Sequence, residues 1–265
     1  MAGLPSKMIL LENTNYQSVY ELYLKESFFY PLIAAVLLQK QDGVVFVNDS
    51  ANPTQIYVEH RFGFAQLFGV VDNSFELKLE HYLFVSKQFT PEKIRLYAPQ
   101  APQFILKPEY EAFQSQRQRF IFDQEPLIRD TQAKDNIHCV IVNEGNCAKI
   151  DLEFHVVSRF WRNTEDFIKG SKAVVVTYNN QIASICYAAA EANHCAEIDV
   201  LTLPNFRNLG LGKQAVLGFI HRCTELSVAP VWDCFTNNFG SMALCNSVGF
   251  IAADRPYLFF TIPKG

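Results

Sequence analysis

The spacing of apolar residues predicts alternating helices and strands along the first half of the chain. Four residues recur at helical intervals: Tyr16, Val19, Tyr20 and Tyr23. The apolar stretch that begins at Pro31 predicts a second helix, because proline suits the first helical position. The remaining elements predicted in this half are strands over 43–48, 56–59, 62–68 and 94–97, and a helix over 74–85 with Ser74 as its N-cap. The first half is therefore predicted to be an α+β domain.

A polar segment separates the two halves. Residues 109–119, EYEAFQSQRQR, suit a helix or a linker. The stretch 124–136 is also polar and contains Pro126, which favours a domain boundary there. We therefore expect an N-terminal domain over 1–125 and a second domain over 126–265.

The second half has a more regular pattern. Asn163 predicts the N-cap of a short helix that Gly170 ends. The Asn179–Asn180 pair between two apolar runs predicts a β-hairpin. The other predicted elements are strands over 173–178, 182–190, 196–203, 231–235 and 257–262, and helices over 209–226 and 241–248. The antiparallel hairpin argues against a parallel sheet, and together the elements predict a mixed α/β fold.

Composition and charge exclude several classes of protein. Hydrophobic residues make up 49% of the 265 residues and charged residues 19%, which excludes a disordered chain or a charged coiled coil. The net charge of −4 gives no basic face for a phosphate backbone, so we expect no nucleic-acid partner. The longest apolar run, 28–38, contains Pro31 and is too short to span a bilayer. We therefore expect no membrane association.

The cysteines and the N-terminal segment point to a reducing compartment. The seven cysteines form no C-x-x-C pair, and several lie in apolar stretches, which is typical of buried free thiols. Neither they nor the six histidines have the spacing of a metal site, so we expect no metal. The first residues lack the layout of a signal peptide. We expect a cytoplasmic protein, and nothing in the sequence indicates an oligomer.

The segment 200–213, VLTLPNFRNLGLGK, is the candidate ligand-binding segment of the chain. A predicted strand ends near Pro204, and Arg207-x-x-Gly210-x-Gly212 follows at the start of a helix. Glycines let the backbone approach a ligand closely, and the N–H groups and dipole at a helix N-terminus attract an anion. The segment matches neither G-x-G-x-x-G nor G-x-x-x-x-G-K-[ST], so it predicts neither a Rossmann nor a P-loop site.

These motifs resemble those of the GNAT N-acetyltransferase superfamily. Its signature is Arg/Gln-x-x-Gly-x-Gly/Ala after a strand, followed downstream by an asparagine, a helix and Gly-Phe, as at Asn238 and Gly249–Phe250 here. The runs 160–167 and 231–234 resemble the zwittermicin-resistance-type subgroup, whose members carry an N-terminal half of degenerate GNAT-like build. A faint similarity between 44–47 and 174–177 fits that build, although chance similarity between β-meanders explains it equally well.

The resemblance implies a mostly antiparallel central sheet flanked by helices, an acetyl-CoA site and a small-molecule amine acceptor. In the family, the strand before the loop holds the pantetheine arm through backbone groups, the loop amides hold the pyrophosphate, and the asparagine contacts the CoA arm. The corresponding positions here are Val200, Leu201 and Thr202; Arg207, Asn208, Leu209, Gly210, Leu211, Gly212 and Lys213; and Asn238. The N-terminal half has no such glycine loop, so we expect it to bind no CoA.

Three residues are candidates for the acid and the base of acetyl transfer. Glu197 lies on the strand where several family members carry a catalytic glutamate. Its spacing to the loop is one residue short, which would turn it to the other face of the sheet unless a bulge restores it. Asp199 shares the face of Glu197. Cys245 stands where many members have a tyrosine as general acid, and a packing role is open for it as well. For Trp161 and Trp232 we expect a place in the core.

Two further functions stay open beside acetyl transfer to an amine. The missing tyrosine leaves room for a catalytically silent acyl-CoA-binding or sensing module. Alternatively, the N-terminal half could be the working surface and bind a protein or peptide partner. The sequence does not identify the acceptor, because specificity in such folds lies in loops.

Overall fold

The structure is a computed structural model of the chain and describes residues 8–123 and 136–265. These residues form two compact units: the first runs to Arg117 and includes 256–265, and the second is Gln118–Arg255. The predicted boundary between residues 125 and 126 lies outside the described residues. The segment 256–265, which we assigned to the second domain from the sequence, groups with the first unit.

The first unit is a sheet with the strand order β1-β2-β3-β4-β5-β13-β6. Its strands are β1 (Ile9–Leu10), β2 (Gly43–Val47), β3 (Gln55–His60), β4 (Phe64–Gly69), β5 (Lys93–Ala98), β13 (Tyr257–Pro263) and the first part of β6 (Gln114–Phe122). Its helices are α1 (Tyr16–Tyr23), α2 (Pro31–Leu37) and α3 (Asn73–Glu80), with 3₁₀ turns at Asn13–Asn15, Gln103–Leu106 and Pro108–Phe113 and a π-helical turn at His81–Ser86. In this unit β4 and β5 pair in parallel, which the crossover through α3 permits.

Local sequence explains most of these elements. Pro31 occupies the first turn of α2, as predicted, and every residue of this helix is buried. The helix predicted from Ser74 begins one residue earlier, because Asp72 rather than Ser74 is the N-cap and its carboxylate accepts hydrogen bonds from the N–H groups of Ser74 and Phe75. The α-helical part ends at Glu80 and gives way to the π-helical turn.

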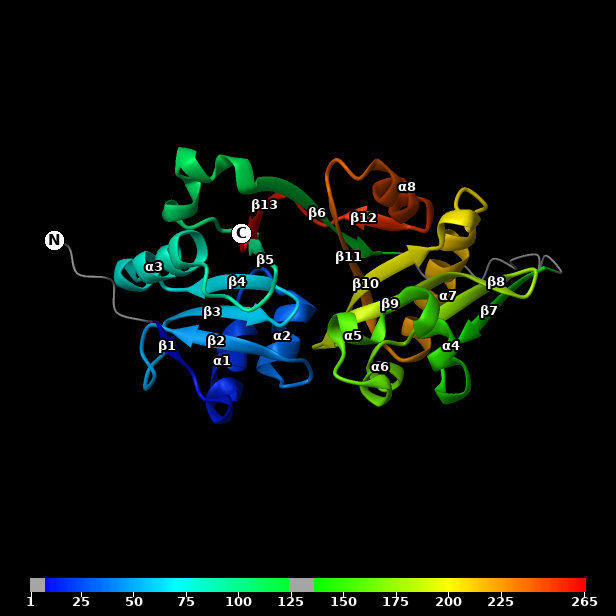
Figure 1. Cartoon of the computed structure of the whole chain (residues 1–265), viewed down its shortest axis with the longest axis horizontal. Helices are drawn as coiled ribbons and strands as arrows, with labels where there is room; N and C mark the ends of the chain where they lie inside the picture. Colours follow the sequence, from blue (N-terminus) through cyan, green and yellow to red (C-terminus); the bar gives the residue numbers. More distant parts are fainter. Residues whose placement is uncertain (1–7, 124–135) are drawn as a thin grey trace. The chain divides into compact units, whose positions relative to one another are not determined.

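The second unit has the strand order β6-β11-β10-β9-β8-β7, with β12 paired to β6 (Figure 1). Its strands are the second part of β6, β7 (Ile137–Ile141), β8 (Val174–Tyr178), β9 (Gln181–Ala192), β10 (Cys195–Thr202), β11 (Ala229–Phe235) and β12 (Phe250–Ala252). Its helices are α4 (Glu144–Phe154), α5 (Val157–Phe160), α6 (Thr164–Gly170), α7 (Leu211–Glu225) and α8 (Phe239–Ser247), with a 3₁₀ turn at Pro204–Phe206. The predicted hairpin at Asn179–Asn180 is confirmed, and both asparagines have the positive φ that a tight hairpin turn requires.

The two units repeat one succession of elements. In the first, β2, β3 and β4 form an antiparallel meander, and α3 then crosses over to β5, which is parallel to β4. In the second, β8, β9 and β10 form the meander, and α7 crosses over to β11, which is parallel to β10. The segment before α3 is thus the counterpart of the glycine loop before α7. The mixed α/β class with a mostly antiparallel sheet is confirmed.

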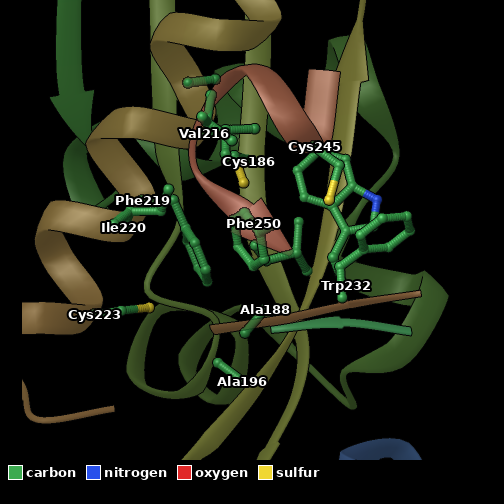
Figure 2. Packing of buried hydrophobic residues seen from close by; sticks show 14 of the residues in the cluster. Cys186, Ala188, Ala196, Val216, Phe219, Ile220, Cys223, Trp232, Cys245 and Phe250 are labelled. Atoms are coloured by element: carbon green, nitrogen blue, oxygen red, sulfur yellow. The ribbon is translucent and has the colours of Figure 1, made fainter. Parts of the chain in front are cut away.

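The core of the second unit joins α7 and α8 to one face of the sheet (Figure 2). Val216, Phe219 and Ile220 of α7 belong to one buried cluster with the small strand residues Ala188 and Ala196, and Val216 lies beside Cys186. Small side chains on the strands let a helix pack closely on the sheet. The helix also lies close to the sheet at Gly218, where a Cβ would meet a Val174 methyl group at 2.9 Å. The glycine loop therefore precedes a helix that is held firmly on the sheet.

Two strands differ from the sequence prediction. Residues 114–119 are polar but belong to β6, although we expected a helix or a linker there. Arg117 is buried with its guanidinium 4.9 Å from the centre of the Phe259 ring, and the Gln118 amide donates to the backbone oxygen of Asp254. The predicted strand 257–262 exists as β13, but it pairs with β5 and β6 in the first unit (Figure 1).

Candidate active site

The loop after β10 is fixed by hydrogen bonds to the neighbouring strand. The Ser184 hydroxyl on β9 donates to the Leu201 carbonyl at 2.8 Å and lies 2.9 Å from the Thr202 hydroxyl. The Leu203 N–H donates to the carbonyl of Ala183 at 2.9 Å, and Pro204 then begins the 3₁₀ turn. Arg207 reaches back to the Thr202 carbonyl at 3.5 Å. The end of the strand and the start of the loop therefore have a defined geometry.

Two glycines shape the start of α7. Gly210 is the N-cap in the left-handed region, with φ +77°, and a Cβ built on it would meet no atom within 4 Å. At Gly212 a Cβ would come within 3.1 Å of the Thr202 hydroxyl, so a side chain would crowd the strand end. Because Gly210 has no side chain to cap the helix, the first N–H groups of α7 are directed to whatever occupies the open space before it.

The strand before the loop separates from its neighbour. β10 pairs with β11 over Cys195–Glu197, opposite Ala229–Val231, whereas its pairing with β9 continues to Thr202. In the part of the chain that the structure describes, Val200, Leu201 and Thr202 therefore have a partner strand on one side only. Their backbone groups on the other side lie where an extended ligand arm can add to the strand.

The register of β10 changes at Glu197. Between Glu197 and Ile198 the pairing with β9 skips Ala189, so the extra residue of the bulge lies in β9 and the side chains of β10 still alternate. Ile198 packs in the core with α7, which places Glu197 and Asp199 together on the opposite face of the sheet. Glu197 is buried there, with 4% of its surface exposed. A bulge is present at this point, but it lies in β9 and does not change the face to which Glu197 points.

Asp199 lies in a small polar network. Its carboxylate accepts a 2.6 Å hydrogen bond from the Tyr187 hydroxyl and lies 3.3 Å from the Arg159 guanidinium on α5. Burial, together with the negative charge of Asp199, raises the pKa of Tyr187, so the phenol keeps its proton and donates it to the carboxylate. Asp199 is thus held in place by two neighbours from other elements.

The helix that follows β11 holds two of the predicted residues. Asn238 is exposed at the N-cap of α8, where its side-chain oxygen accepts from the Ser241 N–H at 3.1 Å. Cys245 is fully buried beside Trp232, as Figure 2 shows. Burial raises the pKa of the Cys245 thiol, with a smaller contribution from Cys234 and Asp233. Both tryptophans are buried as expected, and the Trp232 indole donates to the Ser241 hydroxyl at 3.1 Å.

A buried ion pair in the second unit escaped the sequence analysis. Arg119 on β6 donates from Nε and Nη2 to one carboxylate oxygen of Asp233 on β11, at 2.9 and 2.7 Å. The Asp233 side chain is 1% exposed. Arg119 stood at the end of the segment 109–119, where a helix or a linker was expected, and Asp233 stood in the predicted strand 231–235. The only signal was a charged residue inside a predicted strand.

The counterpart of this site in the first unit has a different helix start. There the Asp72 carboxylate caps α3 and accepts from Ser74 and Phe75 at 2.9 and 3.1 Å. It also accepts from the Asn48 amide at 3.1 Å, and these hydrogen bonds lower its pKa, so it is negatively charged. At the start of α3 the Asp72 carboxylate thus binds the first helix N–H groups, whereas no side chain caps the start of α7.

The described residues contain neither a cluster of potential metal ligands nor a helix that could span a membrane. Residues 8–123 and 136–265 contain no group of three or more His, Cys, Asp or Glu side chains placed to hold a metal ion. Within these ranges, no helix is both long and apolar enough to cross a bilayer.

Sequence comparison identifies a family and one curated relative. A family model described as GNAT acetyltransferase matches residues 24–260. The curated protein "Uncharacterized N-acetyltransferase YdfB" of Bacillus subtilis (strain 168) is 28% identical over 102 residues, which are 38% of this chain and 39% of that protein. The match therefore spans about two fifths of the length of that relative.

Solved structures share the fold over nearly the whole chain. A GCN5-related N-acetyltransferase-like protein from Streptococcus suis superimposes with a TM-score of 0.72 at 17% identity, covering 95% of this chain and 100% of that one. A tandem GNAT protein from the clavulanic acid biosynthesis pathway has a TM-score of 0.63 at 11% identity and covers 98% of both chains. At these identities the likeness shows the fold.

Proposed function

The chain belongs to the GNAT acetyltransferase family, and on that premise we propose that it is an acetyl-CoA-dependent N-acetyltransferase for a small-molecule amine. The observation that carries the proposal is the start of α7, where Gly210 leaves open space in front of uncapped helix N–H groups. The pyrophosphate of CoA binds there, on the amides between Asn208 and Lys213. The pantetheine arm lies along Val200–Thr202, where β10 has separated from β11. The exposed Asn238 contacts the arm from the start of α8.

The reaction is a direct transfer within this site. The neutral amine attacks the thioester carbonyl, its proton passes to a base, and the carbon–sulfur bond breaks to release CoA, whose thiolate takes up a proton. Backbone N–H groups of β10 stabilise the oxyanion that forms. Glu197 is the stronger candidate for the base, because it is buried, with 4% of its surface exposed, on the strand where several family members carry a catalytic glutamate. Asp199 is held by Tyr187 and Arg159. We assign Asp199 a positioning role on the same face.

The proposal also includes a role for the first unit and a cell compartment. A negative carboxylate, Asp72, stands at the start of α3, so we assign no CoA site to the first unit. All seven cysteines are free thiols, which suits a reducing cytoplasm. The assignment to the zwittermicin-resistance-type subgroup rests on the runs 160–167 and 231–234 and is part of the same proposal.

The proposal is tested first with the unmodified protein. Calorimetry should show one acetyl-CoA bound per chain, and a panel of small amines should then be screened for release of CoA. If acetyl-CoA binds but no amine releases CoA, the silent binding or sensing module replaces the enzyme. If acetyl-CoA does not bind at millimolar concentration, both functions are wrong.

Replacing Glu197 by Gln should lower turnover by about 100-fold, because general-base catalysis contributes a factor of this size. The affinity for acetyl-CoA should not change. The matched control is Glu225→Gln, on the exposed end of α7 where Glu225 pairs with Arg222. Turnover and its pH profile should be measured for both variants with the best amine of the panel. An unchanged pH profile in Glu197→Gln would remove Glu197 as the base.

Replacing Cys245 by Ala should leave turnover within about threefold of the unmodified enzyme and lower the stability of the second unit by about 1–2 kcal/mol, as a small core truncation does. The physical reason is that the thiol is fully buried in the core and keeps its proton. Steady-state kinetics and urea denaturation check the two parts. A loss of turnover above 100-fold at unchanged stability would restore Cys245 as the general acid.

A further inference from the structure

The first unit contains a cavity of about 860 Å³, within the range of small-molecule sites. Its walls come from the β1 segment, β2, β3, and the stretch from the end of α3 through the π-helical turn to residue 91, so every lining residue belongs to the first unit. Most of the wall is apolar, with Leu10, Val44 and Phe46 contributing side chains. It lies at the C-terminal end of α3, away from Asp72, and so does not correspond to the phosphate position before α7.

One buried carboxylate lies in this apolar wall. Glu59 is only 3% exposed, and the hydroxyls of Tyr57 and Tyr82 both donate to its Oε2, at 3.2 and 3.0 Å. Among the described residues, no hydrogen bond joins the other oxygen, Oε1, to the protein. Glu59 lines the cavity, so this oxygen can accept from a ligand there, and a charge-assisted hydrogen bond to a carboxylate is about twice as strong as a neutral one.

Aromatic rings surround the carboxylate. The Phe46 and Tyr82 rings lie 5.4 Å apart between centroids, and the Tyr57 and Tyr82 rings lie 6.2 Å apart. Aromatic faces attract a cation, and they do so more strongly where water is excluded. Rings and carboxylate together provide both the charge and the surface that a positively charged group requires.

Burial also acts on the charge of the carboxylate. It raises the pKa of Glu59 to about 7, although the two tyrosine hydroxyls and Lys264 oppose the shift. A bound cation compensates for this desolvation and favours the ionised form. The other charged or titratable groups that line the cavity are Asp42, Arg61, Lys78 and His81. Asp42 and Arg61 pair at 3.6 Å, and both side chains are nearly half exposed.

We propose that the first unit binds a small apolar amine in this cavity, with the ammonium group on Glu59 Oε1 and the apolar body against Val44 and Phe46. The site is separate from acetyl transfer, since it contains no residue of the second unit. A test of this amine site therefore neither supports nor contradicts the proposed acetyl transfer.

Three probes with one fluorophore test the proposal on the full chain without acetyl-CoA: dansylcadaverine, a primary amine; dansylamide, which is neutral; and dansylglycine, a carboxylate. Dansylcadaverine should bind with enhanced fluorescence and at least tenfold more tightly than either of the others, because a charge-assisted hydrogen bond contributes about that much. Equal binding of the three probes, tighter binding of dansylglycine, or no binding of dansylcadaverine would overturn the proposal.

Glu59→Gln removes the charge and keeps the shape, so it should weaken dansylcadaverine at least tenfold and leave dansylamide unchanged. The matched control is Glu76→Gln, which changes a buried carboxylate of the same unit that bonds Gln55 and does not line the cavity. A Glu59→Gln variant that binds dansylcadaverine as tightly as the control variant does would overturn the assignment.

The unmodified protein gives a second readout if Glu59→Gln does not fold. Ionisation of Glu59 with a pKa of about 7 should strengthen dansylcadaverine binding as the pH rises from 5.5 to 8.5, because the amine stays protonated over this range. His81→Gln should keep this dependence, which separates Glu59 from the histidine at the cavity. Binding that does not change with pH, or a dependence that disappears in His81→Gln, would overturn the proposal.

Discussion

Gly210→Asp should lower the affinity for CoA by about 100-fold, whereas Gly210→Asn should lower it by less than tenfold. The two side chains have the same shape, and both residue types tolerate the left-handed backbone at this position, with φ +77°. They differ in one negative charge in front of the α7 amides. Such a charge about 4 Å from a phosphate costs on the order of 4 kcal/mol at a partly screened site, before ionic strength reduces it. The substitution gives α7 the kind of cap that Asp72 gives α3.

Calorimetric titration with CoA checks this prediction. The difference between the two variants should shrink at high salt, since screening weakens a charge effect and leaves a steric effect unchanged. Equal losses in both variants would mean that backbone strain, and not charge, controls the loop. Full binding of CoA by Gly210→Asp would place the CoA site away from the start of α7, and the first unit would then need to be considered.

Arg119→Met should destabilise the second unit by about 3–5 kcal/mol. The change leaves the Asp233 carboxylate, 1% exposed, without its guanidinium partner in the interior. Removing both charges together, with Arg119→Met and Asp233→Leu, should restore most of the stability, because buried ion pairs are often replaced by apolar residues at little cost. The comparison separates the penalty of a lone buried charge from the value of the pair.

Denaturation followed by tryptophan fluorescence suits this measurement. The chain has two tryptophans, and both Trp161 and Trp232 lie in the second unit, so their emission reports that unit. Arg222→Met serves as the control, because its pair with Glu225 is partly exposed and contributes at most about 0.5 kcal/mol. A cost below 1 kcal/mol for Arg119→Met would mean that water reaches Asp233.

Elements that depend on local signals could be predicted from the sequence. Pro31 marked the start of α2, the Asn179–Asn180 turn marked the hairpin, and apolar periodicity found α7 to within two residues at each end. The polar part of β6, residues 114–119, could not be predicted, because its side chains are satisfied by distant partners. Arg117 lies over the ring of Phe259, and its sequence neighbours bond residues more than a hundred positions away. A local pattern contains no information about such partners.

The candidate site could likewise be predicted only in part. Glycines and a strand–helix junction are a local signature, so the loop before α7 was visible in the sequence, and the geometry of Gly210 agrees with it. The environment of Asp199 was not visible, because Tyr187 and Arg159 come from other elements. The cavity around Glu59 was equally hidden, since its walls come from four separate segments.

The position of β13 between β5 and β6 bears on how the protein is made. A ribosome releases residues in order, so the first unit emerges with a gap in its sheet that stays open until Tyr257–Pro263 have been synthesised. The second unit, Gln118–Arg255, has all of its strands before that point. The half of the protein that is translated first is therefore completed last. During that interval the unpaired edges of β5 and β6 need protection from aggregation, by a chaperone or by rapid synthesis.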